Sequence, residues 1–169
     1  PGTEELAFVA AFLNEGLRQG NICGILLFDM PHENMISKLT DFGVNAKKAL
    51  DSEAMVIADL WSEGKYDPER RGPILLTDNL TDPNSALRLY YDLAELNEKR
   101  LRSGKFTGSR LVVYSMSSQI MNYKFEATYK LDKIGVNMIR QAKVLSLAVI
   151  DPEMFDETVV AAFEHMNDG

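Results

Sequence analysis

Short apolar runs alternate with amphipathic stretches along the whole chain. Four of these runs are almost continuously apolar, which predicts strands buried on both faces of a sheet. They span 22–30, 55–60, 110–116 and 144–150, and a shorter strand candidate spans 74–77. Strands of this kind are typical of a parallel sheet that is covered by helices.

The stretches between the runs carry apolar residues at helical spacing. They predict helices over 6–17, 33–39, 45–50, 82–102 and 129–142, and a last helix after residue 151. Asp82-Pro83 and Asp151-Pro152 each combine a capping carboxylate with a proline suited to the first helical turn. We expect a break near Gly135 in the fifth helix, because glycine is a poor helix former.

The helix over 82–102 has an apolar stripe that we expect to face the sheet. Its members are Leu87, Tyr90, Tyr91, Ala94 and Leu101. Basic residues close this helix, where cations suit the helix dipole, and we interpret them as a solvated helix end rather than a nucleic-acid patch. They are Lys99, Arg100, Arg102 and Lys105.

Length and composition favour one globular domain over residues 1–169. The net charge of −7 and the pI near 4.9 argue against nucleic-acid binding through overall charge. The single cysteine, Cys23, lies in an apolar run, and we expect it to be buried. No apolar run reaches the roughly 20 residues of a membrane span, and no signal peptide is visible, so we expect a cytoplasmic protein.

The first six residues, Pro1-Gly2-Thr3-Glu4-Glu5-Leu6, resemble a phosphate-binding loop with altered chemistry. A working loop would read Pro-Gly-Thr-Gly-Lys-Thr, in which glycine lets the backbone turn in on phosphate, lysine answers its charge and the hydroxyl holds Mg²⁺. A carboxylate in the place of the lysine reverses the sign of the charge. One unit charge at about 4 Å is worth about 4 kcal/mol at an effective dielectric near 20.

With this loop the chain resembles the KaiC-type branch of the RecA superfamily of P-loop ATPases. The landmarks follow in family order: LNEGLRQG at 13–20, DFGVN at 41–45, RLVVYSMS at 110–117 and HMNDG at 165–169. The resemblance implies an α/β fold, a three-layer RecA-like P-loop NTPase core in which helices cover both faces of a mainly parallel sheet. It also implies that this stretch lacks the strand before the P-loop and the last strands of the family core.

The resemblance also implies where a nucleotide site would lie. The implied positions are Gly2, Thr3, Glu4, Glu5, Leu6, Tyr114 and Ser115. Tyr114 stands where the family has its Mg²⁺-orienting aspartate. Asp29 and Met30 stand where it has paired glutamates, so Asp29 is the candidate remnant of the catalytic base. Because several catalytic positions differ together, the resemblance implies lost hydrolysis, and we expect no cofactor.

Three functions stay open at this point. The first is a non-hydrolysing regulatory or assembly protein that forms a homo-oligomer or binds a protein partner, without nucleic acid or membrane. The second is an ATP-binding switch or ATPase that would take Mg²⁺ with ATP or ADP. The third is a recombinase-like protein that binds DNA.

The two histidines, His32 and His165, are far apart and have no cysteine companions, so we expect no metal site.

Overall fold

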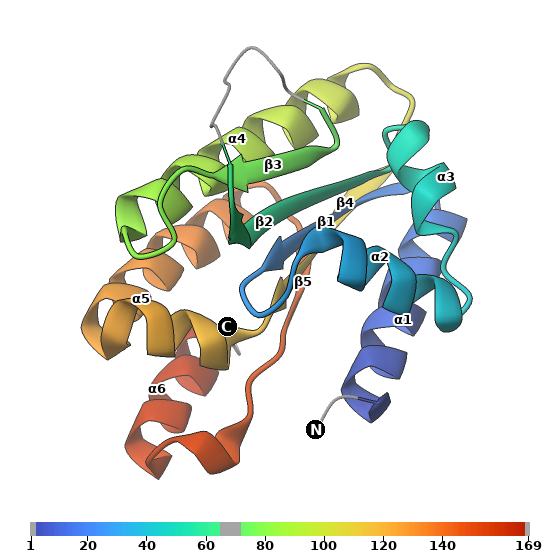
Figure 1. Cartoon of the computed structure of the whole chain (residues 1–169). Coiled ribbons are helices and arrows are strands. Elements are labelled where there is room, and N and C mark those ends of the chain that lie inside the picture. The colour runs from blue at the N-terminus through green and yellow to red at the C-terminus, as the bar shows by residue number, and fades with distance from the viewer. Residues whose placement is uncertain (1–2, 65–71, 168–169) are drawn as a thin grey trace.

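The computed structural model describes residues 3–64 and 72–167, and these form an α/β fold around a five-stranded sheet. All neighbouring strands are parallel, in the order β3-β2-β1-β4-β5. The strands are β1 (Asn21–Leu27), β2 (Met55–Glu63), β3 (Ile74–Thr77), β4 (Gly108–Tyr114) and β5 (Leu145–Ala148). Strand β1 lies in the centre, and β3 and β5 form the two edges (Figure 1).

Helices cover both faces of this sheet and produce the three layers that the sequence predicts (Figure 1). One face carries α1 (Thr3–Arg18), α2 (His32–Asp41) and α3 (Ala46–Asp51). The other carries α4 (Pro83–Arg102) and α5 (Met116–Gln141). The chain then forms a 3-10 turn, Pro152–Met154, and α6 (Glu157–Asn167), which packs against α5.

The continuous apolar runs fit the central strands because successive side chains point to opposite faces. In β1, Cys23 and Ile25 belong to the apolar core under α1, whereas Leu26 belongs to the core under α4 and α5. Strand β2 repeats the pattern with Ile57 on the first face and Val56 on the second. Both faces are buried, so the runs have no polar alternation, as the sequence predicts.

The two predicted Asp-Pro starts have different outcomes. Asp82 caps α4, and its Oδ1 accepts a hydrogen bond of 2.9 Å from the Asn84 backbone N–H. Asp151 caps only the 3-10 turn, where its Oδ1 accepts a bond of 3.1 Å from the Glu153 N–H. Helix α6 begins later, at Glu157.

Cys23 is fully buried, as expected, and burial raises the pKa of its thiol to about 12.

The region from 116 to 150 departs most from the sequence prediction. Helix α5 begins at Met116, thirteen residues before the predicted start at residue 129. It is interrupted at Lys124, with φ 64° and ψ 161°, and not at Gly135. Gly135 is buried instead, where a Cβ would come within 3.2 Å of the Tyr90 ring. Strand β5 was predicted as buried, yet Leu145 is 55% exposed because this strand forms the edge.

The predicted inner stripe of α4 is largely wrong. Of its five members only Tyr90 is buried, and Tyr91 is 53% exposed. The residues that α4 does bury are Ser85, Ala86, Leu89, Tyr90, Leu93, Leu96, Asn97 and Arg100. Arg100 is therefore not part of a solvated helix end, and desolvation lowers the pKa of its guanidinium.

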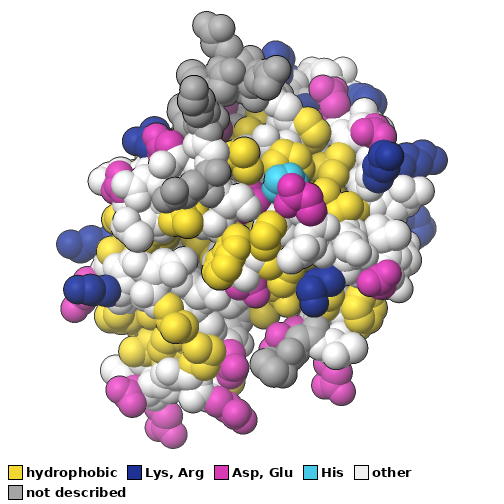
Figure 2. Space-filling model, in the orientation of Figure 1, with side chains coloured by type: hydrophobic (Ala, Val, Ile, Leu, Met, Phe, Trp, Pro, Cys, Tyr) yellow, Lys and Arg dark blue, Asp and Glu magenta, His cyan; other side chains and the backbone are white. Residues whose placement is uncertain are grey.

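The remaining surface features agree with the acidic composition. Acidic side chains gather around α6 at the lower left of Figure 2, beside an apolar patch over α5 and α6. The charged, turn-rich stretch over 62–72 begins within the end of β2, and its residues 65–71 lie outside the described part of the chain. In that described part, every helix is too short or too polar to cross a lipid bilayer.

Candidate functional site

Three of the candidate residues, Asp29, Tyr114 and Ser115, lie where the parallel strands end. Tyr114 is the last residue of β4 and pairs with Leu27, the last residue of β1. The Phe28 N–H donates a hydrogen bond of 2.7 Å to the Tyr114 carbonyl, and Asp29 is the next residue in the chain. Ser115 follows Tyr114 as the N-cap of α5. The carboxyl ends of strands are where open α/β sheets bind their ligands.

The first described residues, from Thr3 onward, form a helical turn. Thr3, Glu4, Glu5 and Leu6 belong to the first turn of α1, and Gly2 lies outside the described residues. Glu4 and Glu5 are the acidic residues of this turn, a position that suits the positive end of the helix dipole. Leu6 is only 3% exposed and shares the core under α1 with Tyr114. The side chain at the expected hydroxyl position therefore packs in the core.

Glu5, Asp29 and Tyr114 are close enough to act on one another through charge. Desolvation raises the pKa of Asp29, and the charge of Glu5 adds to the rise, while the charge of Lys38 opposes it. The Oδ1 atom of Asp29 is buried without a hydrogen-bond partner among the described residues. Burial raises the pKa of the Tyr114 phenol to about 12, and the charges of Asp29 and Glu5 contribute. The site therefore combines two carboxyl groups with a neutral phenol.

A second polar cluster, absent from the sequence prediction, surrounds Asp59 of β2, which pairs with Leu27 at the end of β1. Asp59 is fully buried, and its Oδ2 accepts hydrogen bonds from the His32 backbone N–H at 2.9 Å and from the His32 ring Nδ1 at 2.7 Å. Its Oδ1 accepts from the backbone N–H groups of Trp61 at 2.9 Å and Ser62 at 2.7 Å. Asp59 thus links the start of α2 to the backbone near the end of β2. A carboxylate inside an otherwise apolar strand was the signal for it.

His32, Glu33 and Asp59 offer one possible metal-ligand atom each, all within 4.8 Å of one another. Their existing contacts do not match a metal centre. Asp59 already accepts four hydrogen bonds, which occupy the lone pairs of both oxygens. The two carboxylates also contact different nitrogens of the His32 ring, Nδ1 for Asp59 and Nε2 for Glu33 at 3.3 Å. This geometry supports the imidazole and leaves no shared position for a cation.

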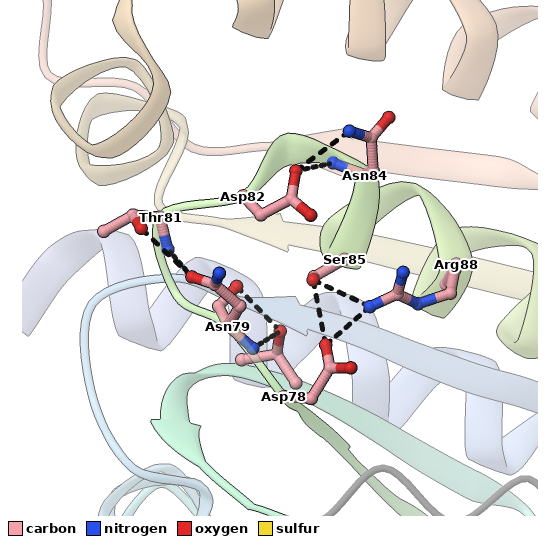
Figure 3. Close-up of polar contacts among 8 residues, drawn as sticks. Asp78, Asn79, Thr81, Asp82, Asn84, Ser85 and Arg88 are labelled. Carbon is pink, nitrogen blue, oxygen red and sulfur yellow. Dashed lines mark hydrogen bonds and ion pairs between the residues drawn. The ribbon is translucent and has the colours of Figure 1, made fainter.

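The loop after β3 is held at the same end of the sheet by side-chain contacts (Figure 3). Asp78 Oδ1 accepts hydrogen bonds from Ser85 Oγ at 2.9 Å and from Arg88 Nη2 at 2.6 Å. These contacts hold the pKa of Asp78 below its usual range, with Ser85 as the main cause. Asn79 Oδ1 accepts a bond of 3.0 Å from the Thr81 N–H. Each contact stabilises the turn that leads into α4.

The comparisons with known proteins concern the fold. No protein-family model matches the sequence, and no curated protein matches it significantly. The solved structure of the uncharacterized protein PH0321 of Pyrococcus horikoshii, in complex with an unknown peptide, is similar with a TM-score of 0.71 and 14% identity. The match covers 95% of this chain and 68% of that one.

A second solved structure carries a family name. The KaiC-like protein PH0186 of the hyperthermophilic archaeon Pyrococcus horikoshii OT3 is similar with a TM-score of 0.59 and 18% identity, over 96% of this chain and 64% of that one. This chain thus spans less than two thirds of the KaiC-like protein. At such identities the likeness establishes the fold alone: this chain has the RecA-like α/β fold of a KaiC-like protein.

Proposed function

We propose that this chain is a KaiC-like RecA-fold domain that does not hydrolyse nucleotide and acts as a regulatory or assembly protein. The observation that carries the proposal is the placement of Asp29 and Tyr114 at the carboxyl ends of β1 and β4, with the Glu5 carboxylate of the first turn of α1 near enough to add to the rise in both pKa values. In the family that this chain resembles, the corresponding positions hold the phosphate-binding lysine, one of the paired catalytic carboxylates and the Mg²⁺-orienting aspartate.

Electrostatics at this point oppose a triphosphate. Glu5 supplies a negative charge where the family has a lysine, and it already raises the pKa values of Asp29 and Tyr114. A phosphate oxygen placed about 4 Å from the Glu5 carboxylate would meet a repulsion of about 4 kcal/mol per charge at an effective dielectric of 20. The first turn of α1 offers free backbone N–H groups at the positive end of the helix dipole, but the carboxylates of Glu4 and Glu5 already stand at that end.

The chemistry of hydrolysis also lacks its usual groups. The Tyr114 phenol, with a pKa raised to about 12, is neutral at pH 7 and is a poor partner for Mg²⁺. Met30 stands beside Asp29 where the family has a second glutamate, and a thioether cannot accept the proton of an attacking water. Asp29 alone would have to polarise water with no metal-orienting carboxylate opposite it.

A polypeptide is the partner that we propose for this chain. The similar protein PH0321 was solved in complex with a peptide. We infer that this chain, too, works through contact with polypeptide, either a partner or further copies of itself. Sedimentation velocity over a range of protein concentrations separates these two cases, because self-association depends on concentration.

Thermal unfolding in the presence of Mg²⁺-ATP tests the proposal. A ligand that binds the folded state stabilises it by mass action, so we expect no rise in melting temperature at millimolar Mg²⁺-ATP beyond that given by Mg²⁺ with pyrophosphate. A nucleotide-specific rise of several degrees would establish the ATP-binding alternative. DNA binding whose affinity falls steeply with salt would establish the recombinase-like alternative.

One variant identifies the physical cause. Glu5→Lys restores the cation and is made at a partly exposed position, so the fold should tolerate it. If the charge of Glu5 excludes phosphate, this variant gains affinity for ATP, whereas the neighbouring variant Glu4→Lys, at an exposed position, gains much less. Equal gains in both variants would indicate nonspecific attraction to the added charge.

A further inference from the structure

Three polar groups converge at the carboxyl ends of β1 and β4. Asp29 follows the end of β1, Tyr114 ends β4, and Glu5 lies in the first turn of α1. Leu6, next to Glu5, belongs to the same apolar core as Tyr114, so the start of α1 lies close to the ends of these strands. The charges of both carboxylates reach the Tyr114 phenol, where they add to the rise in pKa that burial causes.

Two of these groups leave hydrogen-bonding capacity unused. Tyr114 is only 5% exposed, and its hydroxyl forms no hydrogen bond among the described residues. Asp29 Oδ2 is also unpaired in that part of the chain, and neither atom is sealed from solvent as Asp29 Oδ1 is. Oδ1 lies out of reach of a ligand, so Oδ2 and the phenol oxygen are the atoms that a ligand would contact. A largely buried polar side chain without a protein partner marks a place where a polar ligand can bind.

The charge around these atoms is negative. Glu4 and Glu5 stand at the start of α1, and Asp29 adds a third carboxylate. The dipole of α1 offsets about half a unit charge. Lys38 of α2 is the described cation whose charge acts on Asp29, but no ion pair within 4.0 Å joins it to Asp29 or Glu5 in the described part of the chain. Negative charge therefore remains in excess, which favours a cationic ligand.

An organic cation fits these groups better than a metal ion. Among the described residues, the group of three possible metal ligands lies elsewhere, around Asp59, so Asp29 and Glu5 supply two carboxylates at most. A hard divalent ion would have to keep most of its water at such a site. An ammonium or guanidinium group instead needs only oxygen acceptors for its N–H groups, and it can lie against an aromatic ring such as that of Tyr114.

We propose that this altered nucleotide site accepts the basic side chain, lysine or arginine, of a polypeptide. Asp29 Oδ2 and the Glu5 carboxylate accept hydrogen bonds from the cation, and the Tyr114 hydroxyl accepts another. The inference rests on the proposed function, in which this chain works through contact with polypeptide, and it names the chemical group that docks. The charge of the bound group is thus opposite to that of the phosphate for which the resembled family uses this site.

Two short peptides test the role of the positive charge. They are acetyl-Ala-Arg-Ala-amide and acetyl-Ala-citrulline-Ala-amide, in which citrulline has nearly the shape of arginine but is neutral. Each is titrated into the ¹⁵N-labelled full chain and followed by amide chemical shifts. The Arg peptide should shift the amides of Glu5, Asp29 and Ser115 and approach saturation at millimolar concentration. The citrulline peptide should bind about 5-fold more weakly or not at all. The Asp29 carboxyl, followed by its Cγ chemical shift, should titrate at lower pH with the Arg peptide bound, since a nearby cation lowers the pKa of a carboxyl group.

Variants locate the bound cation. Asp29→Asn and Glu5→Gln keep the shapes of the side chains, and each should weaken binding of the Arg peptide about 3- to 10-fold. Glu5 is partly exposed in the first turn of α1, so Glu5→Gln tests the site even if Asp29→Asn fails to fold. Glu33→Gln removes an exposed carboxylate from the first turn of α2 and is the matched control, which should change the affinity by less than about twofold.

Three results would overturn the inference. The first is equal affinity for the Arg and citrulline peptides, which removes the role of the charge. The second is unchanged affinity for the Arg peptide in both Asp29→Asn and Glu5→Gln, which places the peptide elsewhere. The third is loss of the Arg peptide in millimolar Mg²⁺ beyond that in NaCl of equal ionic strength, which identifies a metal ion as the ligand.

The proposed function fails in a different measurement. A nucleotide-specific rise in melting temperature with Mg²⁺-ATP would overturn it, and that assay contains no peptide. Absence of peptide binding without such a rise would overturn only the present inference.

Discussion

Gly16 of α1 lies directly against the side chain of Arg110 of β4. Arg110 is 8% exposed and crosses from the sheet to the helix, where its Nη1 donates a hydrogen bond of 3.0 Å to the Phe12 carbonyl. Its Nη2 donates to Gln19 Oε1 at 3.0 Å, and its Nε donates to Asn21 Oδ1 at 3.1 Å. The guanidinium also lies 4.9 Å from the centre of the Phe12 ring. One buried cation thus holds the C-terminal half of α1 on the sheet.

Gly16→Ala should destabilise the fold, although alanine is the better helix former. A Cβ at this position would come within 2.5 Å of Arg110 Cδ and 2.9 Å of Cys23 Sγ. Overpacking of this kind costs about 1–3 kcal/mol, against a gain of about 1 kcal/mol in helix propensity. Urea unfolding should therefore give a net loss of up to about 2 kcal/mol. In an Arg110→Ala background the added cost should shrink, and an unchanged cost would contradict this contact.

The sheet could be predicted from the sequence because its strands are buried on both faces. Such strands are continuous apolar runs, and runs such as 55–60 and 110–116 are visible without any knowledge of their neighbours. The edge strand β5 has the same apolar composition, but the sequence does not show that Leu145 is left 55% exposed at the edge of the described sheet. The composition of a strand shows which side chains it could bury, whereas the position of the strand in the sheet determines which of them are buried.

The buried face of α4 could not be predicted because part of it is polar. Asn97 and Arg100 are buried on the inner face, whereas Tyr91 is exposed. Apolar residues on both sides of the helix allow two overlapping stripes, and the polar residues favour the wrong one. The candidate site differs at its edge: the sequence predicts the helix from Leu6 and an altered loop before it, whereas in the structure the helix already begins at Thr3 and Leu6 is buried in the core.

Lys124→Gly should stabilise the protein. Lys124 interrupts α5 with φ 64° and ψ 161°, a region that essentially only glycine occupies without strain. Relief of this strain, about 1–3 kcal/mol, exceeds the entropic cost of a glycine, about 0.5–1 kcal/mol. We expect a gain of about 1 kcal/mol in urea unfolding. Lys133→Gly, at an exposed position in the regular part of α5, is the matched control and should lose about 1 kcal/mol. Similar losses in both variants would show that Lys124 is helical.

Asp132 should make the stability depend on pH. Its side chain is buried between α5 and α4, where Gln119 Nε2 donates hydrogen bonds to Asp132 Oδ1 at 3.0 Å and to Tyr90 Oη at 3.1 Å. Burial raises the pKa of this carboxyl from 3.8 to about 7, because desolvation outweighs the hydrogen bonds from Gln119 and Tyr90. The folded protein therefore keeps a proton that the unfolded chain releases between these two values.

The sign follows from this difference in bound protons. The stabilising effect is complete below pH 3.8 and is lost as the pH rises to about 7, so this group lowers the free energy of unfolding across that window. Each pH unit costs about 1.4 kcal/mol. Asp132→Asn keeps an oxygen for Gln119 and removes the titration, so it should be more stable than the parent at pH 8, with a flatter profile between pH 4 and 7. Asp41→Asn, at an exposed position, is the control. Parallel profiles for the parent and Asp132→Asn would refute a proton on Asp132.

Leu6→Thr should cost stability without restoring a metal ligand. Leu6 is 3% exposed in the core under α1, whereas Phe8 on the same helix is 63% exposed. Loss of a buried leucine costs roughly 1.5–3 kcal/mol, and a buried hydroxyl without a partner adds to this. Phe8→Thr should change the free energy of unfolding by no more than about 0.5 kcal/mol. A mild effect of Leu6→Thr, close to that of Phe8→Thr, would mean that the first turn of α1 opens readily. Attempts to rebuild a phosphate site should therefore change Glu4 and Glu5 and leave Leu6 in place, because the core needs its side chain.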